Sequence, residues 1–358
     1  MKNRKGYAVM NNEAFRRKSL ITVLSVMMVW TMTGCGSGTV KGDDLSAEAP
    51  AQSNETAAAQ EDQAFEPFIR IDRDDPKASE RDLENLRIIT KGEYQLSKPK
   101  DKYGIDPDIP VNETGLDALN VSASAQFNER QLHILAEKLR DIAPGKEIYI
   151  FDFRRESHAF LDGLPFSLYA DHNWSNIGLT TEQIEMNEQL IFGALAGTKF
   201  QAFAKDDGMR GEMAEYQPER MMSEKELVES EGLQYIRLPI KDHSWPAPEE
   251  LDTFIEFVRT HDMDNVWMHF HCHAGTGRTG AFMVIIDKMK NPDIPMEDIC
   301  IRQSYLMSSY MLQTETSDEF KAPLYQEKAE RAIQFGQYVE ENHASNFALS
   351  WSEWLSKQ

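Results

Sequence analysis

Apolar residues recur along this chain with two different periods, one typical of helices and one typical of strands. In residues 128–142 the apolar positions lie three and four residues apart, which predicts an amphipathic helix. Residues 147–153 form a short, mainly apolar run that predicts a strand. By the same reasoning we expect helices over 182–195, from Pro248 onward and over 279–289, and strands over 200–203, 234–240 and 266–270. Strands that alternate with helices predict an α/β fold with a central, mostly parallel sheet flanked by helices.

A basic segment followed by a short apolar run opens the chain. Residues 20–30 are too few to span a bilayer of about 30 Å, but they suit the core of a signal peptide. Met32-Thr33-Gly34-Cys35 follows and resembles a bacterial lipobox, in which the cysteine is acylated. We therefore expect residues 1–34 to be a lipoprotein signal peptide and Cys35 to carry a lipid. The protein is then expected in the bacterial cell envelope, anchored to a membrane and facing outside the cytoplasm; an ordinary signal peptide or an uncleaved anchor is the alternative.

Composition divides the rest of the chain in two. Residues 35–64 have almost no apolar content, which predicts a flexible tether. Residues 65–358 have the apolar content of an ordinary packed core and are expected to form the folded domain. The formal net charge of −21 argues against nucleic-acid binding, which needs basic surfaces. Any site for an anionic substrate must therefore be a local positive pocket.

The segment His271-Cys-His-Ala-Gly-Thr-Gly-Arg-Thr279 joins a predicted buried strand to a predicted buried helix. A cysteine five residues before an arginine can wrap a loop around one phosphate, with the backbone amides and the helix N-terminus pointing inward. Arg278 can hold two phosphate oxygens, and the same positive field favours the thiolate of Cys272, the expected nucleophile. Thr279 is expected to donate a hydrogen bond to the sulfur. The loop residues expected to bind phosphate are His273, Ala274, Gly275, Thr276 and Gly277.

Two other interpretations of this segment remain open. Gly275, Gly277 and Gly280 also fit a dinucleotide-binding glycine pattern, but too few residues follow to complete such a sheet. A buried cysteine beside a tight turn would leave Arg278 and the glycines without a role.

A thiolate mechanism needs a proton for the leaving oxygen. Asp242 lies in a loop between a predicted strand and a predicted helix, at the same edge of the sheet as the phosphate loop. We expect Asp242 to be the general acid; a helix-capping or solvated acid is the alternative. Its neighbours Lys241 and His243 are candidates for substrate contact, although His243 could equally support the loop. No metal ligands occur at zinc spacing, so no metal or other cofactor is expected.

Taken together, these motifs resemble those of the protein-tyrosine-phosphatase-like phytases, bacterial cysteine phosphatases that act on inositol phosphates. The resemblance extends from about Phe65 to Leu355 and is carried by segments 115–126, 152–158, 242–246 and 269–279. The phosphate loop is shared by all cysteine phosphatases, whereas Glu-Ser-His and Asp-His-Ser-Trp-Pro are more particular to this branch. The resemblance implies a tyrosine-phosphatase core with a small β-rich accessory region, a deep basic pocket and stepwise removal of phosphate without a metal.

The resemblance also assigns further residues. Asp152 would orient groups around the pocket, and Arg70 would help to bind substrate phosphates. Looser candidates for substrate binding are Lys205, Lys321 and Lys328, for which an ordinary surface position is the alternative. A last group could line the pocket or form structural ion pairs, namely Arg154, Arg155 and His158.

Three features depart from the family pattern or need their own explanation. His273 stands where several members have an acid, and a cation there would favour anions. Residues 314–319 are acidic where members that bind phytate tend to be rich in lysine. Cys300 is expected to be buried and structural, with a reversible disulfide to Cys272 as the alternative.

The expected function is a cysteine-dependent phosphomonoester hydrolase that removes phosphate from inositol polyphosphates through a phosphocysteine intermediate. A phosphotyrosine or broad-specificity phosphatase is the alternative within the same chemistry. A phospholigand-binding lipoprotein without catalytic activity is the alternative of another class. The expected partners are a small phosphorylated substrate and, through the lipid, a membrane.

Overall fold

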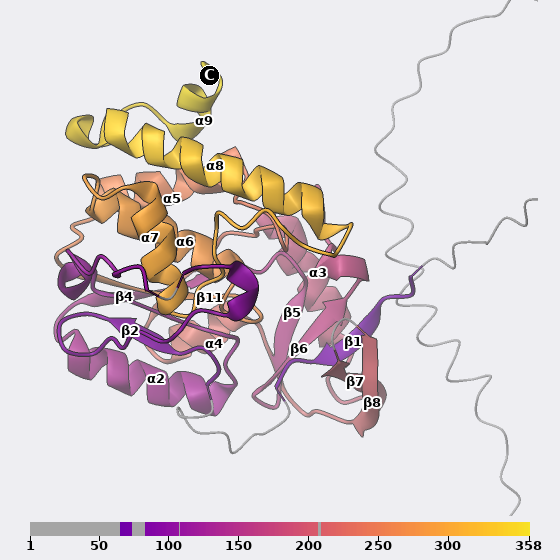
Figure 1. Ribbon diagram of the computed structural model, residues 1–358. Coiled ribbons are helices and arrows are strands. Elements are labelled where there is room, and N and C mark those ends of the chain that lie inside the picture. Colours follow the sequence, from indigo (N-terminus) through magenta and orange to yellow (C-terminus); the bar gives the residue numbers. More distant parts are fainter. Residues whose placement is uncertain (1–64, 74–82, 107, 207–208) are drawn as a thin grey trace, which may run out of the picture. The chain divides into compact units, whose positions relative to one another are not determined.

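A five-stranded sheet organises the computed structural model (Figure 1), which describes residues 65–73, 83–106, 108–206 and 209–358. The predicted signal peptide, the tether and Cys35 lie outside these residues. The strand order is β10 (Gln234–Arg237), β4 (Glu147–Asp152), β11 (Val266–His271), β3 (Val121–Ser124) and β2 (Arg87–Ile89). The first four strands are parallel, and β2 runs antiparallel to β3. The predicted α/β fold with a mostly parallel central sheet is confirmed.

Helices cover both faces of this sheet, which explains why β11 is buried along its whole length. Helix α2 (Glu129–Ile142) and α4 (Glu224–Ser230) lie on one face, and α5 (Pro248–Thr260) and α6 (Arg278–Lys290) lie on the other. Aromatic side chains such as Phe151, Phe254 and Phe282 pack between the sheet and the second helical layer. Helix α6 is nearly apolar on every side because it lies inside this layer.

A second, six-stranded sheet forms the β-rich accessory region that the resemblance implied. Its order is β8 (Met209–Tyr216), β7 (Phe200–Asp206), β1 (Phe68–Ile71), β6 (Leu164–Tyr169), β5 (His158–Leu161) and β9 (Met221–Met222). Its strands pair antiparallel except for β1 and β7. Helix α3 (Thr181–Gly193) follows β6 and packs against β5.

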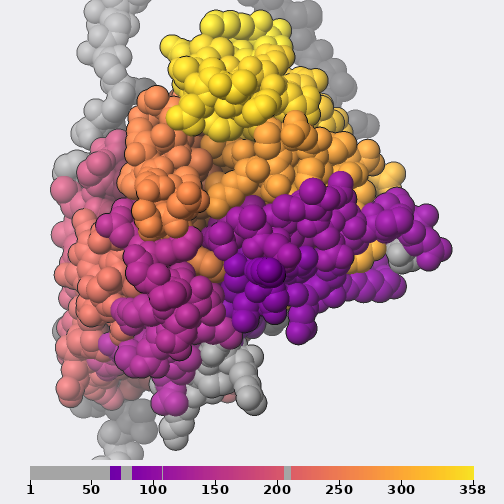
Figure 2. Space-filling model, turned by 90° about the vertical axis from the view of Figure 1, so that its left-hand side faces the viewer, coloured from indigo at the N-terminus to yellow at the C-terminus, as the bar shows by residue number. Residues whose placement is uncertain are grey.

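The C-terminal part adds three helices, α7 (Met296–Tyr305), α8 (Lys321–Asn342) and α9 (Trp351–Leu355). Figure 2 shows the N-terminal part of the domain, in indigo to purple, beneath these C-terminal helices. Short 3-10 turns complete the structure: η2 (Asp101–Tyr103), η3 (Leu116–Ala118), η4 (Asp171–Asn173) and η5 (His343–Ser345). Among the described residues no helix has both the length and the apolar character that crossing a bilayer requires.

The strand expected over 234–240 ends early, at Arg237, and the reason bears on the site. The Leu238 amide still bonds the carbonyl of Asp152, at 2.9 Å, but the Ile240 amide bonds the carbonyl of Leu238, also at 2.9 Å. This tight turn bends the chain away from the sheet. The turn leads directly into the loop that carries Asp242.

Candidate active site

The phosphate loop lies at the carboxyl edge of the central sheet, between β11 and α6. Cys272 is 3% exposed, and the Gly275 amide donates to its sulfur at 3.3 Å. Gly275 has a φ of +72°, and a Cβ there would lie 2.4 Å from the Ser124 carbonyl. Only glycine fits this position, because both the backbone angle and the contact with β3 exclude a side chain.

Other segments hold the outer side of the loop. Three carbonyls of the loop accept hydrogen bonds from these segments. Asn85 Nδ2 donates to the Ala274 carbonyl at 2.8 Å. The backbone amides of Gln126 and Ser309 donate to the carbonyls of His273 and Thr276, at 3.1 and 2.9 Å. Helix α6 begins at Arg278 without an acid in its first turn. The positive end of its dipole therefore faces the loop, as an anion site requires.

Arg278 is held by a carboxylate that sequence reasoning did not assign. Glu156 accepts from both terminal nitrogens of Arg278, at 2.6 and 3.0 Å, and the Phe153 carbonyl accepts at 3.3 Å. Burial raises the pKa of the Glu156 carboxyl, but Arg278 and Arg154 lower it further, so the pKa ends far below its usual range. A two-point ion pair of this kind fixes the plane of the guanidinium.

Asp242 lies directly over this arginine, as expected for a group that serves the same substrate. Its Oδ1 is 3.3 Å from Arg278 Nε, and its side chain is 22% exposed. Burial raises the pKa of the carboxyl, but Arg278 and then His243 lower it, and the net pKa is below the usual value. The structure therefore brings the predicted nucleophile, phosphate clamp and general acid together.

Two loop residues differ from the sequence-based expectation. The Thr279 hydroxyl is buried and makes no hydrogen bond within the described part of the chain, so the expected bond to the sulfur is absent from this structure. The His273 ring is buried against Asp72, with 3.1 Å between Nε2 and Oδ1. Burial and Arg70 lower the pKa of His273 to about 3, so the ring is not the cation that would favour anions.

Arg70 and Asp152 are also buried in contacts with other protein groups. Arg70 donates to Asp72 at 2.9 Å and to Ser167 at 3.1 Å. Asp152 accepts from the Arg154 amide at 2.8 Å and from the Tyr235 hydroxyl at 2.9 Å. It therefore orients Arg154 and Tyr235.

The basic residues of segment 152–158 form structural ion pairs, the second of the two alternatives. Arg154 bonds Asp72 and Glu156, each at 2.9 Å. Arg155 pairs with Glu250 at 2.9 Å. His158 is buried and lies 3.1 Å from Glu224, measured from Nε2 to Oε2.

Several basic side chains surround the Asp242 loop. Lys241 Nζ lies 4.0 Å from the centre of the Trp174 ring. Lys321 pairs with Asp318 at 2.7 Å, so the acidic segment 314–319 partly neutralises the positive charge on this side of the site. Lys328 is 7% exposed, and burial lowers the pKa of its ammonium to about 8, with a further decrease from Lys102.

Lys205 lies in β7, but its side chain is outside the described part of the structure. His243 is half-buried with a φ of +67°, and burial lowers the pKa of its ring below the usual value.

Arg87 was not predicted to lie near the site. Burial lowers the pKa of its guanidinium to about 10, and the nearby Cys272 opposes that decrease. Cys300 is fully buried and free, as expected for a structural residue.

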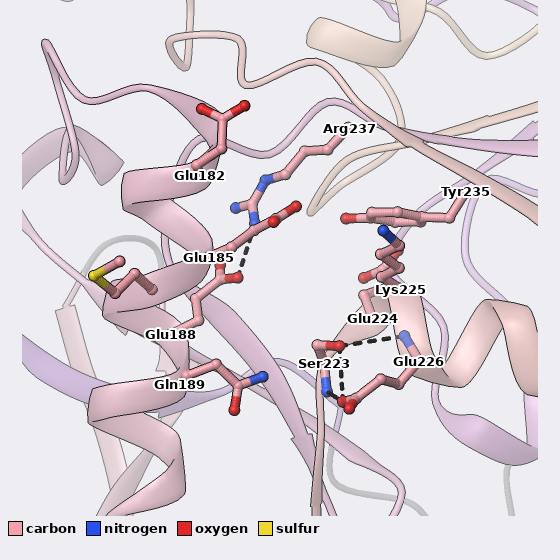
Figure 3. A pocket seen from close by; sticks show the side chains of 11 residues that line it. Glu182, Glu185, Glu188, Gln189, Ser223, Glu224, Lys225, Glu226, Tyr235 and Arg237 are labelled. Carbon is pink, nitrogen blue, oxygen red and sulfur yellow. Dashed lines mark hydrogen bonds and ion pairs between the residues drawn. The ribbon is translucent and has the colours of Figure 1, made fainter.

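A separate cavity of about 480 Å³ lies between α3 and the segment that begins α4 (Figure 3). Its lining is mainly acidic: Glu182, Glu185, Glu188, Glu224 and Glu226, with Lys225 and Arg237 as cations. Figure 3 shows Arg237 directed at Glu188, and their ion pair measures 2.8 Å. Such a lining does not suit a phosphate.

Among the described residues, one group has donor atoms close enough to share a metal ion, namely Asp152, Glu224 and His271 within 4.8 Å. These atoms already contact protein partners: His271 Nε2 is 2.6 Å from Glu224, and Asp152 accepts from Tyr235. The group therefore lies in a network of ion pairs. That the protein needs no metal stays a prediction.

Comparison with known proteins agrees with this geometry. The family model for PTP-like phytases, described by the words inositol hexakisphosphate, matches residues 151–289. The tandemly repeated protein-tyrosine-phosphatase-like phytase of Mitsuokella multacida is 35% identical with a TM-score of 0.71, covering 81% of this chain and 49% of that chain. A PTP-like myo-inositol phosphatase of Mitsuokella multacida, in complex with myo-inositol-(1,3,4,5)-tetrakisphosphate, is likewise 35% identical with a TM-score of 0.71.

Two further proteins extend the comparison. A PTP-like phytase of Bdellovibrio bacteriovorus is 27% identical with a TM-score of 0.62, covering 82% of this chain and 96% of that chain. The effector protein hopD2 of Pseudomonas syringae is 28% identical over 228 residues, 62% of this chain and 48% of its own length. The chain thus spans about half the length of the Mitsuokella and Pseudomonas proteins. The match to the family model and the likeness in sequence and fold to two PTP-like phytases show that this chain belongs to the family of protein-tyrosine-phosphatase-like phytases.

Proposed function

We propose that this protein hydrolyses phosphomonoesters of inositol polyphosphates through a phosphocysteine intermediate, without a metal. The observation that carries the proposal is the arrangement of Cys272, Arg278 and Asp242 around one loop, with Arg278 fixed by Glu156. This set supplies a nucleophile, a phosphate clamp and a proton donor, which are the parts a two-step transfer needs.

In the first step the Cys272 thiolate attacks phosphorus while the phosphorus–oxygen ester bond breaks. Arg278 and the loop amides bind the phosphate oxygens, and Asp242 gives its proton to the leaving alcohol oxygen. The low pKa of Asp242 in the free protein is caused mainly by the neighbouring Arg278, with a smaller contribution from His243. Because a bound phosphate adds negative charge beside Arg278, substrate binding raises the pKa of Asp242 toward the protonated form that the step requires.

In the second step water attacks the phosphocysteine, and Asp242, now ionised, takes the proton of that water. The phosphorus–sulfur bond breaks and the thiolate is restored. The Gly275 amide, 3.3 Å from the sulfur, stabilises the thiolate as a leaving group. Thr279 can make the same contact only if its unpaired hydroxyl turns toward the sulfur.

A multiply phosphorylated substrate is favoured by the cations around Asp242. Lys328 is nearly buried, and both Lys328 and Lys321 lie within the electrostatic range of this carboxyl. A buried ammonium is costly, and a second phosphate group of the substrate would compensate for it. A phosphotyrosine side chain carries only one phosphate and would leave Lys328 without a phosphate partner.

A steady-state assay of the wild type and Cys272→Ser tests the proposal. The substrates are inositol hexakisphosphate, an inositol tetrakisphosphate and a phosphotyrosine peptide. We expect turnover of the inositol phosphates, a much lower kcat/KM on the peptide, and no turnover by the variant. Equal or better activity on the peptide would favour the broad-specificity alternative, and binding without turnover would favour the non-catalytic one.

We also propose that Cys35 carries a lipid that anchors the protein outside the cytoplasm, as the leader sequence predicts. Metabolic labelling with a radioactive fatty acid tests this, with Cys35→Ser as control. Label in the wild type that disappears in the variant is the expected result. A released, unlabelled wild-type protein would indicate an ordinary signal peptide.

A further inference from the structure

The turn η4 lies between the accessory sheet and the catalytic core, and its side chains reach the general acid. Asn173 Nδ2 donates to Asp242 Oδ2 at 3.2 Å and to Glu156 Oε1 at 3.1 Å. Trp174 Nε1 donates to the backbone carbonyl of Asp242 at 3.1 Å. One loop therefore contacts the general acid at its side chain and at its backbone, and also contacts the carboxylate that fixes Arg278.

The chemistry of Asn173 suits this place between two acids. Its amide nitrogen supplies two hydrogens, one for each carboxylate, whereas an aspartate of the same size would add a third negative charge. The residue is 5% exposed and has a φ of +64°, next to His172 with a φ of +52°. Two successive residues in the left-handed region are costly, so the surrounding contacts must hold them there.

Those surrounding contacts join the turn to two other segments. The His172 ring stacks on Phe320 at the start of α8, with 3.4 Å between ring centres and an angle of 9°. Trp174 also contacts Phe320, at 4.9 Å, and carries Lys241 over its face at 4.0 Å. The turn is thereby fixed from outside by α8 and by the residue that precedes the general acid.

We propose that Asn173 and Trp174 are positioning residues that hold Asp242 in its working place over Arg278 before substrate binds. This inference rests on the proposed function of Asp242. Without the two hydrogen bonds, the Asp242 loop would populate other orientations, and proton transfer to the leaving oxygen would be slower. Attack by Cys272 would change much less, because the Gly275 amide contacts the sulfur and Arg278 keeps its two hydrogen bonds to Glu156.

The test compares an inositol phosphate, which needs a proton on its leaving oxygen, with p-nitrophenyl phosphate, which needs much less. Asn173→Ala should lower kcat on the inositol phosphate by about 10-fold to 100-fold, the loss typical of a hydrogen bond to a charged group. On p-nitrophenyl phosphate the kcat of Asn173→Ala should stay within about 3-fold of the wild-type value, because nitrophenolate departs without protonation. Trp174→Phe keeps an aromatic ring but removes the hydrogen bond from Nε1 to the Asp242 carbonyl. It should also lower kcat on the inositol phosphate more than kcat on p-nitrophenyl phosphate, with a smaller loss than in Asn173→Ala.

Asn176→Ala is the matched control, because Asn176 lies in the same loop with a φ of +65°. Its amide donates to the Arg155 carbonyl at 2.9 Å and to Ser157 Oγ at 2.8 Å, and it does not reach Asp242. If this loop contributed only to structure, Asn173→Ala and Asn176→Ala would each lower kcat on the inositol phosphate and kcat on p-nitrophenyl phosphate by the same factor. Selective loss in Asn173→Ala alone supports the proposal.

Asp242→Asn separates this inference from the proposed function. Added to Asp242→Asn, Asn173→Ala should cause no more than about a 2-fold further loss, since both act on one proton transfer. Independent, additive losses, or equal losses on both substrates, would overturn the positioning role while leaving the proposed function intact. If Asp242→Asn itself shows no dependence on the leaving group, Asp242 is not the acid, and both proposals fail.

Discussion

Two buried groups of charges lie next to the phosphate loop, and they differ in how far their side chains reach the surface. The first, here called the Arg278 cluster, contains Arg278, Glu156 and Asp242 together with Asn173. The second, the His158 network, contains His158, Asp152, Glu188, Glu224, Arg237 and His271. In the His158 network each charge contacts an opposite charge of the protein, and every side chain is almost fully buried. In the Arg278 cluster the Asp242 side chain is 22% exposed.

This difference distinguishes a group of charges that can bind a ligand from one that only supports the fold. A buried ion pair that is fully satisfied has no capacity left for a ligand, and removing one partner leaves a costly unpaired charge. A cluster in which an accessible acid lies beside a buried arginine can admit a phosphate, which then pairs with that arginine. We therefore assign catalysis to the Arg278 cluster and support of the strand β11 to the His158 network.

The largest expected effect is on the nucleophile. Cys272→Ser should abolish turnover on every phosphoester while the thermal midpoint stays close to that of the wild type, because an alcohol is not ionised at neutral pH. A steady-state assay and a thermal melt check both parts. Substantial residual turnover would rule out the thiolate mechanism.

Next in size is the effect on the general acid. Asp242→Asn should lower kcat on inositol phosphates by about 10²-fold to 10⁴-fold, the usual contribution of general acid catalysis. The loss on p-nitrophenyl phosphate should be clearly smaller, and the acid limb of the pH profile should change. Equal losses on both substrates with an unchanged profile would mean that His243 or another group supplies the proton.

The same kind of substitution in the His158 network should affect stability instead. Glu188 holds Arg237 at 2.8 and 2.9 Å, and both side chains are buried. Glu188→Gln should lower the free energy of unfolding by about 3–5 kcal/mol, as expected when one partner of a buried pair is lost. Urea unfolding measures this, and kcat per folded molecule should change by less than about 3-fold. A large loss of kcat with unchanged stability would remove the distinction between the two groups.

The pH dependence of unfolding is a gentler probe of the His158 network. Burial and Arg154 lower the pKa of His158, but Asp152 raises it to about 10 overall. Its contribution to stability is therefore fully present below pH about 6.5 and is lost as the pH rises through about 10. Burial raises the pKa of Glu224, but His271 lowers it to about 2, so its contribution is present above pH about 4.5 and is lost as the pH falls through about 2. Urea titrations at several pH values should give a curve that declines at both ends, and a flat curve between pH 7 and 10 would contradict the assignment for His158.

Removal of metal ions should have the smallest effect. Asp152, Glu224 and His271 are the described donors closest to one another, and their contacts are with protein groups. Dialysis against EDTA should leave both kcat and the thermal midpoint unchanged. A loss of activity that one added metal restores would show that this group holds an ion.

The sequence predicted the parts of the site that are contiguous along the chain. The phosphate loop and the Asp242 loop each form a short motif after a strand, and parallel strands bring such loops to one edge. Apart from the strand predicted over 200–203, which belongs to β7, the β-rich region was expected only from the resemblance. Glu156 was not assigned, since its partner Arg278 is 122 residues away and no local pattern marks a pair of that separation.

The surroundings of other residues were missed for a related reason. Arg70 stays a candidate for substrate contact, but its ion pair with Asp72, two residues later, was not expected. His273 looked like a possible cation, but burial makes it neutral. Asn173 lies in no recognisable motif. Its role depends on a left-handed turn, which an asparagine permits but does not by itself predict. Burial and partners, which sequence alone does not give, decide the role of each polar group.

The most direct test of the account is to identify the residue that carries the phosphoryl group during turnover. Asp242→Asn should slow the hydrolysis of the intermediate, because the base that activates water is lost. After rapid mixing with p-nitrophenyl phosphate and acid quenching, peptide mass spectrometry should find one phosphoryl group on Cys272. The same experiment with Cys272→Ser should find none. A phosphoryl group on another residue, or full turnover by a protein that never becomes phosphorylated, would contradict the central claim.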